Sequence, residues 1–126
     1  MPIITATAMC YPTEDREKVR HALLNLFPDA EVEEGASMLT ARTESADRLR
    51  QIIIDNHIRD TARSVMLRGV GDNSTRFTLN KQVAFVGKVS FLDEPAALGG
   101  IEVTVQDENI AKTIDHLAES TVEAVE

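Results

Sequence analysis

Short apolar or alternating segments separated by turns limit the possible folds of this chain more than any other feature of its sequence. Residues 74–79 alternate polar and apolar side chains, which is typical of a strand with one buried face. A longer apolar run over residues 82–92 and a shorter one over residues 101–106 are predicted to be further strands. Short turns join antiparallel strands, whereas a parallel pair needs a crossover connection of about a dozen residues or more. These segments therefore predict a largely antiparallel sheet.

The remaining segments alternate between strands and amphipathic helices. β-Branched and apolar residues predict three more strands, over residues 3–10, 30–33 and 37–42. Apolar residues at helical spacing predict helices over residues 14–27, from Thr43 or Ser45 up to Asn56, over 58–68 and over 108–119. The predicted order is β-α-β-β-α-α-β-β-β-α, in which the second and third helices are either separate or parts of one helix with a kink near His57.

This order of elements predicts an α+β fold, with a mostly antiparallel sheet and helices packed on one face. The other face of such a sheet is open to solvent or to a partner. The sequence contains no internal repeat, no low-complexity segment and no linker. Residues 1–126 are therefore expected to form a single domain, in which residues 120–126 are a frayed tail.

Charge is distributed unevenly along the chain. The 13 basic and 21 acidic residues give a net charge of -8, and an acidic balance argues against a general nucleic-acid binder. However, residues 42–88 contain nine basic and five acidic residues, whereas both flanking segments are acidic. Arginine outnumbers lysine, and the arginine fork is suited to bidentate contact with phosphate. The sequence therefore has a cationic centre between two acidic ends.

The residue types that catalysis or metal binding would need are not brought together at any recognisable spacing. Cys10 is the single cysteine, which excludes an internal disulfide and a cysteine-based zinc site and favours a reducing, cytoplasmic location. The histidines His21, His57 and His116 lie in separate predicted helices without partners at metal-ligand spacing. No apolar run reaches the roughly 18 residues of a membrane helix. We therefore predict no catalytic, metal or cofactor site and interpret the chain as a non-enzyme.

Basic and amide side chains of the central segment form a candidate RNA-binding site. Arg59 and Arg63 are one helical turn apart, so they are expected to project side by side. The segment 80–82 is predicted to be a turn between two strands. Cationic side chains suit phosphates, and amides suit polar base edges. The candidate residues are Arg59, Arg63, Arg68, Arg76, Asn80, Lys81, Gln82 and Lys88.

Several longer strings carry a resemblance to a known family. They include Tyr11-Pro12-Thr13-Glu14-Asp15, Leu67-Arg68-Gly69 and, most specifically, the string LNKQVAFVGKVSF over residues 79–91. Over about residues 1–118 the chain resembles an archaeal uncharacterised protein family, number 201 in its series. The resemblance implies a branch of a wider archaeal group described, by prediction, as RNA-binding. It also implies a fold similar to that of the ribosomal protein that binds 5S rRNA, and no catalytic residues.

The leading hypothesis is a non-catalytic RNA-binding or RNP-associated module whose partner is rRNA or another structured RNA. A protein-interaction or oligomeric scaffold module is the first alternative, with a homodimer or another protein covering the open sheet face. Ala84, Val86 and Ser90 of the predicted strand 82–92 are small or weakly charged, which suits that role. A second alternative is an unrecognised enzyme or small-ligand binder, which would need a pocket lined by titratable groups.

Overall fold

The computed structural model of the protein describes residues 2–92 and 100–118. Within them, the strands form one sheet in the order β2-β3-β1-β6-β4-β5, and all neighbouring strands are antiparallel. The strands are β1 (Ile3–Met9), β2 (Glu31–Glu34), β3 (Met38–Thr43), β4 (Ser74–Asn80), β5 (Phe91–Leu92) and β6 (Gly100–Gln106). The helices are α1 (Arg16–Leu26), α2 (Asp47–Asp55), α3 (Arg59–Arg68), α4 (Lys81–Ala84) and α5 (Ile110–Leu117). The predicted α+β class with a mostly antiparallel sheet is confirmed.

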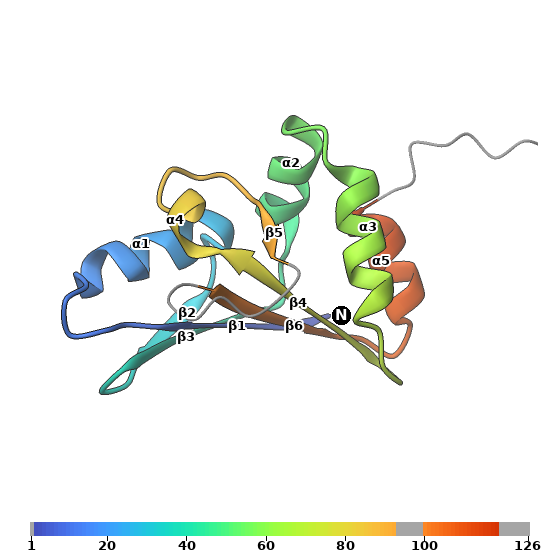
Figure 1. Ribbon diagram of the computed structural model, residues 1–126. Coiled ribbons are helices and arrows are strands. Elements are labelled where there is room, and N and C mark those ends of the chain that lie inside the picture. Colours follow the sequence, from blue (N-terminus) through green and yellow to red (C-terminus); the bar gives the residue numbers. More distant parts are fainter. Residues whose placement is uncertain (1, 93–99, 119–126) are drawn as a thin grey trace, which may run out of the picture.

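All helices labelled in Figure 1 lie on one side of the sheet. The burial pattern of the strands agrees with this arrangement, because every second side chain is buried. In β1, for example, Ile4, Ala6 and Ala8 are buried, whereas the intervening Thr5 and Thr7 are partly exposed. The core therefore lies between the helices and one sheet face, and the other face is not covered by any helix of the described residues.

The second and third predicted helices are separate in the structure. Helix α2 ends at Asp55, and His57 adopts a left-handed backbone conformation with a φ of 57°. Few residues other than glycine adopt this conformation, and a single residue of this kind interrupts a right-handed helix. The chain then starts α3 at Arg59 in a new direction, so that both helices pack against α5.

The prediction of one long strand over residues 82–92 is wrong. Strand β4 runs on to Asn80, whose side-chain oxygen accepts hydrogen bonds from the backbone N–H groups of Gln82 (2.8 Å) and Val83 (3.3 Å). This cap starts the short helix α4, which ends in a turn where Gly87 has a φ of 74°. In a short apolar run the sequence period does not distinguish a strand from a buried helical turn. Only residues 91 and 92 pair with β4.

This correction removes the surface that the scaffold alternative relied on. Ala84 is completely buried in α4, and Val86 lies on the turn after it with 71% of its surface exposed. Ser90 lies in the loop just before β5. The three residues therefore do not share a sheet face. The predicted frayed tail over residues 120–126 lies outside the described residues. Among residues 2–92 and 100–118, none of the helices has the length and apolar character of a membrane span.

Candidate nucleic-acid interface

The uncovered face of the sheet carries polar side chains in rows that cross the strands. In the strand register, Thr5 of β1 lies opposite Arg42 of β3 on one side and Thr104 of β6 on the other. Thr104 in turn lies opposite Arg76 of β4. These four residues, in the order Arg42, Thr5, Thr104, Arg76, are called the arginine–threonine row. Neighbouring strands are about 4.8 Å apart, so three spacings place the two arginine Cα atoms roughly 14 Å apart. The row therefore has a guanidinium at each end and two hydroxyls between them.

A second row lies beside the first on the same face. It contains Thr40, Thr7, Glu102 and Thr78, in the order of strands β3, β1, β6 and β4. Glu102 is exposed, and within the described residues its carboxylate has no ion-pair or hydrogen-bond partner. The centre of the uncovered face therefore combines five threonine hydroxyls, two arginines and one carboxylate.

The lateral edge of this face at β2 is acidic. Glu31 and Glu33 alternate with the inward-facing Val32, so their carboxylates lie on the uncovered side. An oxygen of Glu33 lies 3.9 Å from a guanidinium nitrogen of Arg42, and both side chains are largely exposed. An exposed pair of this kind contributes little stability, about 0–1 kcal/mol. Arg42 is therefore free to exchange this contact for a ligand.

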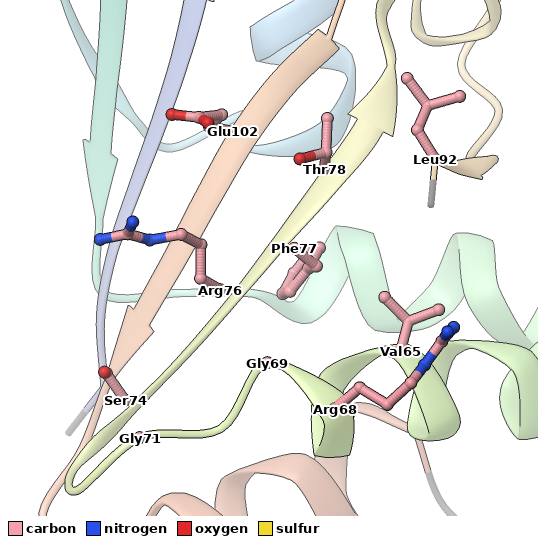
Figure 2. A pocket seen from close by; sticks show the side chains of 10 residues that line it. All are labelled: Val65, Arg68, Gly69, Gly71, Ser74, Arg76, Phe77, Thr78, Leu92 and Glu102. Carbon is pink, nitrogen blue, oxygen red and sulfur yellow. The ribbon is translucent and has the colours of Figure 1, made fainter. Parts of the chain in front are cut away.

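Arg76 is the predicted cation that lies exposed on the uncovered face of the sheet. It is exposed on β4, and no carboxylate of residues 2–92 or 100–118 lies within ion-pair distance of it. Figure 2 shows Arg76 on the β6 side of β4 and Arg68 on the opposite side, at the end of α3. The shallow groove between them is lined by residues of α3, β4, β5 and β6 together with Gly69 and Gly71. Arg68 and Arg76 thus line one groove but approach it from two sides.

Arg63 is engaged inside the helix layer. It forms an ion pair with Asp115 of α5, and its Nη1 also donates to the carbonyl of Ala118 at 3.4 Å. From α2, the Nε of Arg50 donates to the carbonyl of His116 at 2.8 Å. The last carbonyls of a helix lack partners within it, and cations there are favoured by the helix dipole. Arg63 therefore helps to hold the end of α5, and Arg59, one turn earlier, is half-buried.

Lys81 lies in the interior of the protein. Only 2% of its surface is exposed, and its ammonium contacts the Glu14 carboxylate at 2.8 Å and the carbonyl of Met9 at 2.9 Å. The ammonium also lies 5.5 Å from the centre of the Tyr11 ring. Partial burial raises the pKa of Glu14, but hydrogen bonds from Lys81 and from the Tyr11 N–H, together with the Lys81 charge, outweigh this and lower the pKa below its ordinary value. The Lys81 ammonium is therefore not offered to a phosphate in this structure.

The other polar candidates are dispersed. Asn80 caps α4 with its side-chain oxygen, as described above, while Gln82 and Lys88 are exposed on the helix side of the molecule. The eight predicted residues therefore do not converge on one surface, although they are close in sequence. The sequence analysis did not select the threonines or Glu102 of the uncovered face. The threonines could have been recognised from their spacing in the sequence. Threonines alternate with buried apolar residues in residues 3–9, 38–43 and 100–106.

Fold and surface together define an α+β protein with an open antiparallel sheet and one polar, uncovered face. A family model described as RNA binding matches residues 3–107. A UPF0201 protein from Methanothermobacter thermautotrophicus is 41% identical over 109 residues, which cover 84% of this chain and 83% of that protein. A UPF0201 protein from Pyrobaculum neutrophilum is 43% identical over 119 residues, which cover 86% and 83%. The chain belongs to the UPF0201 family of archaeal proteins, and the resemblance inferred from the sequence is confirmed.

One relative is much longer than this chain. A protein from Archaeoglobus fulgidus named UPF0200/UPF0201 is 40% identical over 116 residues, which are 88% of this chain but 35% of that protein. The chain thus spans about a third of the length of that relative.

Solved structures show the same architecture. The crystal structure of a UPF0201 protein superposes with a TM-score of 0.89 at 35% identity and covers 97% of both chains. The UPF0201 protein from Methanococcus jannaschii superposes with a TM-score of 0.82 at 36% identity and covers 99% of this chain and 98% of that one. A DUF54 protein from Archaeoglobus fulgidus shares the fold at 22% identity, with a TM-score of 0.69.

Proposed function

We propose that this protein is a non-catalytic RNA-binding module that contacts RNA with the uncovered face of its sheet. The observation that carries the proposal is Arg76, an exposed guanidinium on a polar sheet face with no carboxylate partner among the described residues. An exposed arginine of this kind is ready to form bidentate hydrogen bonds with a phosphate. The match to a family described as RNA binding supports the same class of partner.

The neighbours of Arg76 extend this chemistry across the sheet. Thr104 and Thr5 place hydroxyls between Arg76 and Arg42, and a hydroxyl can both donate to a phosphate oxygen and accept from a ribose 2′-OH. Most hydrogen bonds between proteins and nucleic acids go to phosphate and sugar. The arginine–threonine row therefore offers the contacts that fix the position of a nucleic-acid backbone.

The remaining exposed or half-buried candidates, three cations and one amide, would contribute only at the margins of this interface. Arg68 lies across β4 from Arg76, and Arg59, Gln82 and Lys88 lie on the helix side. We predict that these residues contact RNA only where the RNA extends past the edge of the sheet. Two phosphate contacts, from Arg42 and Arg76, predict a shallow salt dependence, with a slope of roughly -2 in a plot of log affinity against log salt.

Fluorescence anisotropy with labelled structured RNA over a salt series tests the proposal. Arg76→Ala is expected to weaken binding several-fold and to reduce the salt slope by about 1, because one phosphate contact is lost. Arg48→Ala is the matched control, since Arg48 is also an exposed arginine but lies on α2 in the helix layer. Equal effects of the two substitutions, or no binding by the folded protein at low salt, would contradict the proposal.

A second candidate function is self-association through the same face. Met9 and Met38 are direct cross-strand partners on the uncovered side, and both are 42% exposed. Exposed apolar side chains that are grouped in this way can mark a protein interface. Sedimentation velocity of the protein alone distinguishes the two functions. A stable dimer that Met9→Lys dissociates would favour the scaffold, whereas a monomer that binds RNA favours the first proposal.

A further inference from the structure

We infer that the uncovered face recognises double-helical RNA across its minor groove and that Glu102 accepts a hydrogen bond from the 2-amino group of a guanine. This inference rests on the proposed function, and it names the form of RNA and one base contact. It starts from the charge pattern of the face, which an interface for phosphates alone would not explain.

The face carries no aromatic ring on which an unpaired base could stack. The sequence contains one tyrosine, four phenylalanines and no tryptophan. Phe27 and Phe77 are buried, Phe85 and Phe91 pack against the core, and Tyr11 lies beside the Lys81 ammonium. Proteins that read single-stranded RNA generally stack its bases on aromatic rings. The absence of any aromatic ring from the uncovered face therefore disfavours single strands and leaves the sugar–phosphate surface of a duplex.

The arginine–threonine row matches the minor groove of A-form RNA. That groove is wide and shallow, has a phosphate strand on each side and displays 2′-hydroxyls between them. Arg42 and Arg76 are roughly 14 Å apart at their Cα atoms, since three strand spacings separate them. Each long side chain can reach one phosphate strand. Thr5 and Thr104 lie between the arginines, where the 2′-hydroxyls would be.

Glu102 occupies a position that would be unfavourable on a surface for a single strand. Its exposed carboxylate lies on β6, between the strands that carry Arg42 and Arg76 and two residues from Thr104. Figure 2 shows the Glu102 side chain on the same side of the sheet as Arg76, pointing away from Phe77. A carboxylate repels phosphate, but it accepts hydrogen bonds from amino groups. The guanine 2-amino group is the donor on the floor of a minor groove.

Across the strands from β3 to β4, the face therefore carries a cation at each end, with an acceptor between them in the neighbouring row. The groove carries a phosphate strand on each side and an amino donor between them. Glu31 and Glu33 lie on β2, outside the span from β3 to β4, and a phosphate that binds Arg42 would replace its exposed contact with Glu33. The face thus predicts a preference for duplex over single-stranded RNA, and for guanine–cytosine pairs under Glu102.

Anisotropy with four labelled probes tests the inference. The probes are a short guanine–cytosine RNA duplex, the same duplex with inosine in place of guanine, one of its strands alone, and the matching DNA duplex. Inosine lacks only the 2-amino group. The expected order places the guanine RNA duplex first, at least roughly fivefold tighter than the inosine duplex, given the usual discrimination of one good base contact.

Glu102→Ala gives the decisive comparison. Removing the carboxylate should weaken binding of the guanine duplex and strengthen binding of the inosine duplex, because the latter loses only a repulsive charge. The matched control is Glu31→Ala, which removes an exposed carboxylate from β2 at the edge of the same face, opposite Arg42, and should affect both duplexes equally. A common thermal unfolding midpoint for the wild type and both variants shows that they are folded.

The outcomes separate this inference from the proposed function. Equal affinity for single strand and duplex, or for guanine and inosine duplexes, overturns the inference but leaves RNA binding in place. No binding of any RNA overturns both. A dimer that buries Met9 and persists when RNA is added also overturns the inference, because the face is then occupied by a second copy.

Discussion

The ammonium of Lys81 lies 2.8 Å from Oε2 and 2.9 Å from Oε1 of Glu14, although 67 positions separate the two residues in the chain. Lys81 is almost completely buried, whereas the Glu14 side chain is 24% exposed. The pair joins the segment before α1 to the start of α4. A second contact fastens α4 to α1, since the Asn25 amide donates to the carbonyls of Ala84 (2.9 Å) and Phe85 (3.2 Å).

The unequal burial of this pair predicts unequal effects of substituting its members. Glu14→Gln leaves a buried ammonium without a counter-charge and is expected to lower the free energy of unfolding by about 3 kcal/mol. Lys81→Met leaves a carboxylate that water can reach and one carbonyl, that of Met9, without its donor, which costs about 1–2 kcal/mol. Urea unfolding of both variants measures the difference. A larger loss for Lys81→Met would show that the carboxylate is the more buried partner.

The lowered pKa of Glu14 predicts a pH dependence of stability. Above its ordinary pKa of about 4.5 the carboxylate is ionised in both states, and the full contribution of the pair is present. As the pH falls below this value, the unfolded chain takes up a proton before the folded one does, so stability is lost until the folded pKa is passed.

The measurement is urea unfolding of the wild type and of Glu14→Gln from about pH 7 to about pH 3. Other carboxylates titrate in both proteins and cancel in the difference. The difference in unfolding free energy should be largest at neutral pH and should shrink below about pH 4.5. A constant difference over the whole range would show that the pKa of Glu14 is the same in the folded and unfolded states, and would contradict the lowered pKa.

Gly69 is required because β4 passes directly over it. A Cβ atom at this position would overlap the carbonyl oxygen of Arg76, and the Arg76 N–H donates to the Gly69 carbonyl at 3.2 Å. Gly69→Ala is therefore expected to cost about 3 kcal/mol, at the upper end for overpacking. Gly71→Ala is the control, since its Cβ would meet Ser74 Oγ at an ordinary 3.6 Å. Thermal unfolding should separate the two variants clearly, and equal midpoints would refute the steric explanation.

Asn80 is expected to act through the helix cap that its side chain provides. Asn80→Ala should destabilise the protein by about 1 kcal/mol, the usual cost of losing an N-cap, whereas Asn80→Asp keeps the acceptor and should be close to the wild type. Unfolding free energies test this expectation. If Asn80 instead contacted RNA through its amide, Asn80→Asp would be as stable as the wild type but would bind RNA more weakly.

Sequence reasoning was most successful where the pattern is local. The apolar period predicted the strands near β1, β2, β3, β4 and β6 and the helices near α1, α2, α3 and α5, because burial of one face imposes the period directly. It failed over residues 82–92, where both faces are apolar and a period of two fits as well as a helical turn. There the decision came from the Asn80 cap and from the packing of α4 on α1.

The sequence by itself determined the α+β class, the antiparallel sheet with one open face, and membership of the family. Only the tertiary structure decided which charges are available. Lys81 and Arg63 belong to the same cationic segment as Arg76, yet one is buried beside Glu14 and the other is bound to α5. Arg42 and Arg76 come into one row because strands far apart in the chain pair in a particular register. Strand register and burial depend on contacts between distant segments, and no local period specifies them.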